Sequence, residues 1–241
     1  RSKAAQQINR VFCLCLTGTP IENNVHEYIT ILNTALPGFL NYSGKNFSNN
    51  SDDLNLIIKR SKPFVLRRIK EKINHELTSK TEEVVTLTMS KDQRKLYSGL
   101  LAALRKQLVS HKENKKTNHL SILTALMRLR QVCISPYLLD SSYTDVSPKL
   151  NFIINKLKVL KEEGHSTLVF SQFIKSLDFI EMLCKKEKLD YHRLDGSVSL
   201  SQRKKDIHEF QNSKKPKVFL MSLKAGGVGL NLTQASYVFH M

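Results

Sequence analysis

The sequence lacks an apolar run near the ~18 residues needed to cross a bilayer, and it does not begin with a charged segment followed by a short apolar one. We therefore expect a soluble, unsecreted protein. The four cysteines form no C-x-x-C pair and lack metal-ligand spacing. They predict reduced thiols in a cytosolic or nuclear compartment, with Cys13 and Cys15 in the core of a strand, and they argue against a disulfide framework or a zinc cluster.

Several motifs of common enzyme classes are also missing. The P-loop pattern G-x-x-x-x-G-K-[ST] occurs nowhere, and neither does the dinucleotide pattern G-x-G-x-x-G. Each of the three His-Glu pairs lacks a second histidine four residues later, which excludes a zinc-protease helix, and there is no G-x-S-x-G elbow. No repeat of 20 to 50 residues indicates a solenoid.

Acidic residues are scarce. The 241 residues hold 21 Asp and Glu against 38 Lys and Arg, a formal net charge of +17. The excess is densest in residues 41–120, with 17 basic and 8 acidic side chains. Such a field favours a polyanion, most often nucleic acid, because each neutralised phosphate releases counterions. Charge alone leaves open the plainer alternative that the lysines serve solubility.

The pattern of apolar residues in the first half of the chain predicts one strand and several helices. The continuous apolar run at 11–16 predicts a central strand of a parallel sheet. Residues 25–36 have helical spacing, whereas 41–62 are polar and rich in turn formers and predict a surface loop. Residues 64–136 are expected to be mainly helical, with a capping box of the form S-x-x-Q beginning at Ser90.

From residue 147 the pattern alternates between helices and short apolar strands. The expected strands are 167–170, 191–194, 218–221 and one that begins at 237, and the expected helices are one that carries Leu150 to Leu160 on one face, 175–188 and 201–212. Alternation of this kind predicts an α/β fold with a parallel sheet covered on both faces.

Two turns that follow predicted strands contain groups able to bind phosphate. LTGTPIENN at 16–24 offers two hydroxyls and a glycine, and SLKAGGVGLNLT at 222–233 offers three glycines and a lysine. From these residues alone, a tight strand-to-helix turn and a glycine-rich turn without function remain open for the two segments.

A third block, LVFSQF at 168–173 with RLDGS at 193–197, completes a recognisable series. In this order, the blocks resemble motifs III, IV, IVa and V of the SWI/SNF family of DNA-dependent ATPases in helicase superfamily two. FVLRRIKEKI at 64–73 resembles the basic bridge of that family. The resemblance covers nearly the whole chain and runs from motif III to motif V.

The resemblance implies a RecA-like fold with three parts. Residues 1–40 would end the first RecA-like lobe, 41–146 would form a basic, mainly helical linker, and 147–241 would form the second lobe up to motif V. It also implies a function for particular residues. Thr17, Gly18 and Thr19 would couple the ATP site to the lobe interface and DNA. The residues that would face the DNA phosphate backbone are Ser171, Gln172, Ser222, Lys224, Ala225, Gly226 and Gly227.

The remaining implied residues lie at the nucleotide and between the lobes. Gly229 and Asn231 would approach the nucleotide, and Arg67 and Arg68 would link the lobes. Further residues would brace the second lobe, and they are Arg193, Asp195 and Arg203; for Asp195 an ordinary turn before glycine is an equal alternative.

The resemblance implies a parent protein that uses ATP and Mg²⁺ to move along double-stranded DNA, contacts the DNA through its phosphate backbone and acts on a nucleoprotein. The family's motifs I, II and VI, which bind and hydrolyse ATP, are not in this sequence. We therefore expect a piece of a longer protein that does not turn over ATP alone. The alternatives are another superfamily-two motor, such as a restriction translocase or RNA helicase, and a non-catalytic DNA-binding module. Composition favours a bacterial cytoplasm and nucleoid over a eukaryotic nucleus.

Overall fold

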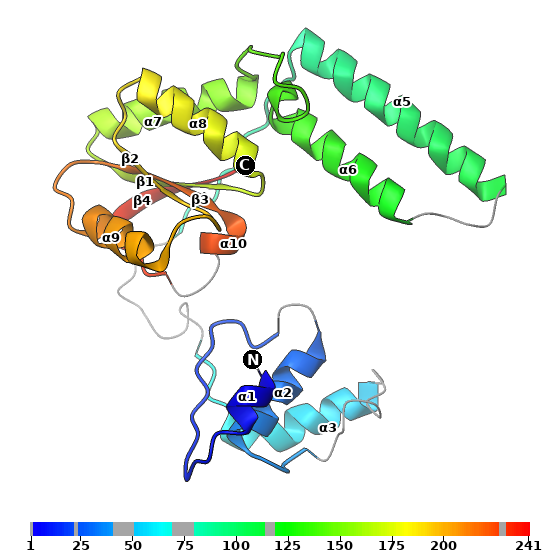
Figure 1. Ribbon diagram of the computed structural model, residues 1–241, viewed down its shortest axis with the longest axis vertical. Helices are drawn as coiled ribbons and strands as arrows, with labels where there is room; N and C mark the ends of the chain where they lie inside the picture. Colours follow the sequence, from blue (N-terminus) through cyan, green and yellow to red (C-terminus); the bar gives the residue numbers. More distant parts are fainter. Residues whose placement is uncertain (1, 22–23, 41–50, 69–79, 114–118, 227–229) are drawn as a thin grey trace. The chain divides into compact units, whose positions relative to one another are not determined.

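A computed structural model describes residues 2–21, 24–40, 51–68, 80–113, 119–226 and 230–241 (Figure 1). The chain divides into two compact units, residues 1–83 and 84–241, here called the first and second unit. Among the helices described, none is both long and apolar enough to cross a membrane.

The second unit contains a sheet of four parallel strands in the order β2-β3-β1-β4. The strands are β1 (Ser166–Ser171), β2 (Tyr191–Leu194), β3 (Val218–Ser222) and β4 (Ala235–His240). All five residues of β3 are buried, as expected for a continuous apolar run in a parallel sheet with helices on both faces. The predicted parallel sheet and the four strands are confirmed.

Helices cover the two faces of the sheet (Figure 1). One face carries α7 (Pro148–Glu162) and α8 (Ile174–Lys186), and the other carries α9 (Leu200–Gln211) and the short α10 (Leu223–Gly226). Each side has its own hydrophobic core, one that contains Leu157, Ile180 and Leu220 and one that contains Leu194, Phe210 and Phe219. The sequence predicted α7, α8 and α9, which are confirmed, but not α10.

Serine side chains fix where two of these helices begin. The hydroxyl of Ser147 accepts from the backbone N–H of Leu150 at 3.3 Å, and that of Ser199 accepts from the N–H of Gln202 at 3.2 Å. Each serine has extended backbone and satisfies one of the N–H groups that a helix start leaves without an intrahelical acceptor.

The second unit also contains a helical hairpin of α5 (Lys91–Glu113) and α6 (His119–Ile134), followed by the 3₁₀ helix η2 (Pro136–Leu138). The capping box is confirmed: the Gln93 N–H donates to the Ser90 hydroxyl at 3.2 Å, and the Ser90 N–H donates to Oε1 of Gln93 at 3.4 Å. The mainly helical segment predicted for 64–136 is confirmed for α5 and α6 and is wrong for 80–90, which form no helix or strand; residues 69–79 and 114–118 lie outside the described residues.

The first unit consists of α1 (Ser2–Gln6), α2 (Val25–Ala35), α3 (Ser51–Ser61) and the 3₁₀ helix η1 (Lys62–Phe64), among the residues described. The predicted helix at 25–36 is confirmed as α2. The loop predicted for 41–62 is wrong for its second half, which forms α3, and its first half lies outside the described residues. The physical reason is the burial of Ile57 against the α2 core.

The strand predicted at 11–16 is wrong. In the described part of the first unit these residues form no strand, and Val11, Phe12, Leu14 and Leu16 are exposed. A central strand needs neighbours on both sides and cover on both faces, and an apolar run alone supplies neither. The expected burial of Cys13 and Cys15 in a strand core is therefore also wrong; both are half-buried, with their Sγ atoms 4.0 Å apart.

Candidate nucleic-acid interface

The candidate interface begins where β1 and β3 end. Ser171 closes β1, Ser222 closes β3, and the two residues are register partners in the parallel ladder. The two segments that resemble motifs IV and V therefore start side by side at the carboxyl edge of the sheet, although some 50 residues separate them in sequence. In open parallel sheets this edge is the usual place for ligand-binding loops.

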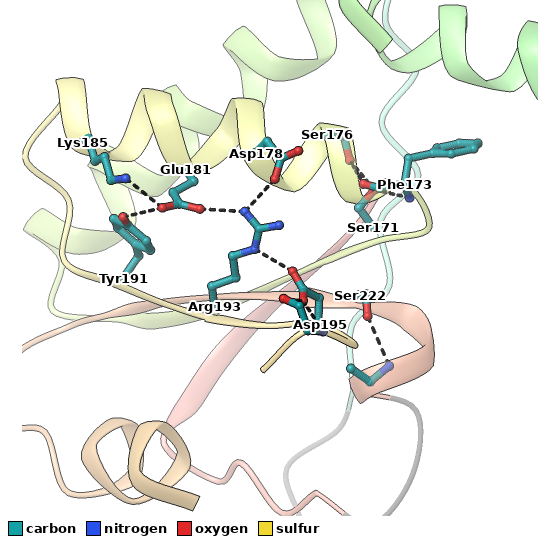
Figure 2. A network of polar contacts seen from close by, with 12 residues as sticks. Ser171, Phe173, Ser176, Asp178, Glu181, Lys185, Tyr191, Arg193, Asp195 and Ser222 are labelled. Carbon is teal, nitrogen blue, oxygen red and sulfur yellow. Dashed lines mark hydrogen bonds and ion pairs between the residues drawn. The ribbon is translucent and has the colours of Figure 1, made fainter. Parts of the chain in front are cut away.

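Hydrogen bonds of two buried serine hydroxyls hold the turn after β1 (Figure 2). The Ser171 hydroxyl accepts from the N–H of Phe173 at 3.2 Å and lies 2.5 Å from the hydroxyl of Ser176. The Ser176 hydroxyl in turn donates to the Phe173 carbonyl at 2.7 Å, and all three residues are buried. The Ser171 hydroxyl thus faces the protein interior and shapes the turn from β1 into α8.

Gln172 is half-buried and its side chain reaches the helical hairpin. Its Oε1 accepts a hydrogen bond from Nη2 of Arg130 on α6, and its Nε2 lies 3.9 Å from Sδ of Met127. Sequence reasoning missed Arg130, because no local pattern connects a helix residue with a loop 42 positions later. The helical hairpin of α5 and α6 therefore contributes a cation to the carboxyl edge of the sheet.

The turn after β3 forms α10. The Ser222 hydroxyl accepts from the N–H of Ala225 at 3.3 Å and so caps this short helix, while Lys224 is exposed. A Cβ added to Gly226 would lie 2.4 Å from Cε1 of Phe170, so only glycine fits there without a shift. Gly227 and Gly229 lie outside the described residues.

Two side chains of α9 form hydrogen bonds with the backbone of the motif V segment and of the residues that follow it. Nη2 of Arg203 donates to the Ala225 carbonyl at 3.1 Å, and Nε2 of Gln211 donates to the Asn231 carbonyl at 2.7 Å. Oε1 of Gln211 also accepts from the N–H of Gln234 at 3.0 Å. Arg203 was expected to brace the second lobe, and its contact with α10 is of that kind; Asn231 itself is exposed.

Arg193 stands at the centre of an ionic network on the α8 side of β2 (Figure 2). Its Nη1 lies 2.7 Å from both Asp178 Oδ1 and Glu181 Oε2, and its Nε lies 2.8 Å from Asp195 Oδ2. Hydrogen bonds from Lys185, and also from Arg193, outweigh burial and lower the pKa of Glu181 to about 2. The arrangement joins α8 to the RLDGS turn and carries no reacting group.

Asp195 is buried at the start of that turn. Its Oδ1 accepts from the N–H and the hydroxyl of Ser197, at 2.8 Å and 2.5 Å. The hydrogen bond from the Ser197 hydroxyl is the largest cause that lowers the pKa of Asp195. This geometry is that of an aspartate that organises its own turn, one of the two roles left open for it.

The site residues of the first unit are placed, but not in relation to those of the second. Thr17, Gly18 and Thr19 are exposed, and the Thr19 N–H donates to the Thr17 hydroxyl at 3.1 Å. Arg67 and Arg68 are exposed on a segment without regular structure. Their predicted roles at the lobe interface stay predictions.

A cluster of possible metal ligands lies near the start of β2 rather than at the carboxyl edge. His192, Asp206 and Glu209 each offer one atom, all within 4.8 Å of one another. However, Nζ of Lys217 lies 3.1 Å from Nε2 of His192, so a cation of the protein itself already sits in the cluster. The arrangement is that of an ionic contact between β2, α9 and the start of β3.

Comparison with protein families decides the wider relationship. The SNF2-related domain matches residues 1–138, and the helicase conserved C-terminal domain matches residues 148–241. The chain belongs to the SNF2-related family. The resemblance to SWI/SNF ATPases is thereby confirmed, and the chain carries domains of SNF2-family ATP-dependent helicases and chromatin remodellers. The domain limits 1–40, 41–146 and 147–241 stay predictions.

Relatives of this SNF2-related chain occur in bacteria and eukaryotes. It is 34% identical over 245 residues to an uncharacterized ATP-dependent helicase of Mycoplasma genitalium, a match that covers 99% of this chain and 23% of the relative. It is 35% identical over 246 residues to human SWI/SNF-related matrix-associated actin-dependent regulator of chromatin subfamily A member 1, covering 93% and 23%. The chain thus spans 23% of the length of these relatives.

Solved structures of SNF2-related proteins share the fold. The Sulfolobus solfataricus SWI2/SNF2 ATPase core in complex with dsDNA has a TM-score of 0.59 and 25% identity, covering 99% of this chain and 53% of that one. The C-terminal domain of a Sulfolobus solfataricus SWI2/SNF2 ATPase has a TM-score of 0.54 and 28% identity, covering 63% and 67%. The predicted α/β fold with a RecA-like parallel sheet is confirmed.

Proposed function

We propose that this chain is part of an ATP-driven motor that moves along double-stranded DNA, and that its second unit binds the phosphate backbone. The observation that carries the proposal is the register pairing of Ser171 with Ser222, which brings the motif IV and motif V segments to one edge of the sheet. The SNF2-related family membership and a structural neighbour in complex with dsDNA support it.

The groups at this edge suit phosphate rather than bases. Lys224 is exposed and supplies a charge, Gln172 adds an amide, and Gly226 lets the backbone come close to a phosphate. Ala225, which the motif also predicts, has its N–H bonded to Ser222 and its carbonyl bonded to Arg203, so it mainly holds the turn. Ser171 and Ser222 act mainly by holding their turns, because their hydroxyls already have partners inside the protein. For Gly227 the phosphate contact is proposed from the motif alone. Contacts of this type position a protein on DNA without reading sequence.

The net charge agrees with such a partner. A chain of charge +17 gains affinity for a duplex by releasing counterions, so binding is expected to weaken steeply as salt rises. The object moved would be a protein bound to DNA, as the chromatin-remodelling names of several relatives suggest. The compartment, a bacterial cytoplasm and nucleoid or a eukaryotic nucleus, stays a prediction.

The residues of this chain do not by themselves fit ATP and Mg²⁺. The sequence has no P-loop, and the described acidic cluster around His192 contains Lys217 and lies away from the carboxyl edge. ATP hydrolysis is therefore proposed for the parent protein. Within it, Gly229 and Asn231 would approach the nucleotide, Thr17, Gly18 and Thr19 would couple the first lobe to the lobe interface, and Arg67 and Arg68 would link the lobes.

DNA binding is tested by titrating a fluorescent duplex with the intact protein at two salt concentrations. Lys224→Gln is expected to weaken binding and to lower the slope of log K against log salt by about 0.9, the value for one phosphate contact. Lys156→Gln, on α7 at the opposite face from α10, is the matched control and should leave both unchanged. An affinity that does not depend on salt would contradict the proposal.

ATP use is tested separately by measuring phosphate release with and without duplex DNA. The intact parent is expected to hydrolyse ATP faster when DNA is present, whereas residues 1–241 alone should release no phosphate above background, because motifs I, II and VI are absent from them. Robust DNA-stimulated turnover by these residues alone would overturn the second expectation.

A further inference from the structure

The end of α6 is fixed to α5, to the start of α7 and to the turn after β1. Nε2 of the buried Gln93 donates to the Val132 carbonyl at 2.6 Å, and the buried Ser147 hydroxyl donates to the Ile134 carbonyl at 2.5 Å. Ile134 and Phe173 belong to one hydrophobic cluster, which joins the end of α6 to the turn after β1. The last turn of α6 therefore has a defined place beside Gln172.

Arg130 lies four residues before the end of α6, next to that last turn, and its side chain is exposed. One of its guanidinium donors, on Nη2, is directed at Oε1 of Gln172. Arginine has five N–H donors in a planar fork, so this contact leaves most of the fork available. Within the described part of the chain, no carboxylate forms an ion pair with Arg130, and its positive charge is not locally neutralised.

We propose that Arg130 and Gln172 together bind one phosphate of the DNA backbone, so that the helical insertion supplies a phosphate-binding residue to the second lobe. The guanidinium would provide the charge and two parallel donors, a geometry that suits phosphate. The Gln172 carbonyl oxygen orients the guanidinium before the ligand arrives. Its amide nitrogen lies 3.9 Å from Sδ of Met127, which leaves one of its two N–H donors for the phosphate. This inference rests on the DNA binding proposed above for the motif IV and motif V segments.

A second role has to be distinguished from this one. Arg130 could serve only to hold Gln172 in place, in which case its charge would not matter for DNA. The salt dependence of binding separates the two, because a lost phosphate contact lowers the slope of log K against log salt by about 0.9, whereas a lost packing contact leaves that slope unchanged.

The test compares Arg130→Gln with Arg128→Gln in the intact protein, by fluorescence anisotropy of a labelled duplex over a range of salt. Arg128 is also exposed on α6, and a residue two positions away on a helix points to another side, so the two variants change the net charge equally. Arg130→Gln should bind about tenfold more weakly at low salt and lower the slope by about 0.9, and Arg128→Gln should change affinity less than about twofold.

Two further variants sharpen the result. Arg130→Lys keeps the charge but not the fork, so it should retain the wild-type slope with an intermediate affinity. The double variant Arg130→Gln/Gln172→Ala should bind no more weakly than the worse single variant, because the two side chains form one unit. Unchanged thermal unfolding of Arg130→Gln would show that the fold is intact.

Equal affinity and equal slope for Arg130→Gln and Arg128→Gln would overturn the inference, and salt-dependent binding by the unmodified protein would then leave the proposed function standing. If the unmodified protein shows no salt-dependent binding to duplex DNA, both fail together. A weaker affinity for Arg130→Gln with an unchanged slope would assign Arg130 to the packing role and also overturn the inference.

Discussion

Gly226 lies directly against the aromatic ring of Phe170, and a Cβ atom built on Gly226 would be 2.4 Å from Cε1 of that ring. The ring has little freedom to turn away, because it stacks on His240 with centroids 5.2 Å apart and planes 10° from parallel. A side chain at position 226 must therefore shift either the Phe170 ring, together with its stacking on His240, or the backbone of α10.

Gly226→Ala is accordingly expected to destabilise the protein by about 1 to 3 kcal/mol and to weaken DNA binding, since overpacking moves the segment that carries Lys224. Urea unfolding and the duplex titration measure the two effects. Gly99→Ala is the matched control, because Gly99 is exposed in α5 with nothing within 4 Å of an added Cβ. It should stabilise by about 0.5 to 1 kcal/mol. Equal behaviour of the two variants would refute the packing argument.

Ser171→Ala removes the acceptor for the buried N–H of Phe173, and we expect a loss of about 1 to 3 kcal/mol of stability. The exposed Ser98→Ala in the middle of α5 should be close to neutral. Urea midpoints give the comparison, and DNA affinity is measured in parallel. Loss of affinity with unchanged stability would show that the hydroxyl reaches the DNA and does not mainly hold the turn.

The low pKa of Glu181 predicts a pH dependence of stability. Because the folded protein holds this pKa near 2, below the ordinary value of 4.5, the ionised carboxylate stabilises the fold above pH 4.5, and that contribution is lost as the pH falls from 4.5 towards 2. Glu181→Gln should be less stable than the unmodified protein at neutral pH and should lose less stability between pH 4.5 and 2. Urea midpoints across this range test the prediction. Glu163→Gln, at the exposed end of α7, should follow the unmodified curve.

The link between α5 and α6 depends on Gln93, whose side chain serves both the capping box and the Val132 carbonyl. Gln93→Ala should cost about 2 kcal/mol, since it leaves a buried carbonyl without its donor, whereas Ser90→Ala loses only the cap and should cost about 1 kcal/mol. Thermal unfolding of the two variants shows which of them loses more stability. A larger loss for Ser90→Ala would contradict this division of roles.

Periodicity in the sequence was sufficient for most of the second unit. In α7 the apolar positions 150, 153, 154, 157 and 160 are all buried, as one helical face requires. The apolar runs of β1 and β3 became neighbouring parallel strands, but the sequence pattern predicted neither their pairing nor their register. Local patterns succeed here because each element buries its own face against the four-stranded sheet.

The failures have a common physical cause, which is that the deciding contacts are not local. Residues 11–16 have the composition of a strand but no strand beside them in the described part of the first unit. The polar start of α3 concealed the helix that buries Ile57. Arg130 is invisible as a site residue until the fold brings α6 against the end of β1, because an exposed arginine on a helix usually has no function beyond solvation.

The strand order gives the second unit a particular route of assembly. β1 is the first strand to be synthesised, yet it lies inside the sheet and its Thr167 pairs with both Val218 and Tyr237. The two central pairings must therefore wait until nearly the whole unit has left the ribosome, whereas the hairpin of α5 and α6 depends on contacts close in sequence. During synthesis, the helical hairpin of α5 and α6 can become ordered before the sheet and the turn after β1, against which the end of α6 packs.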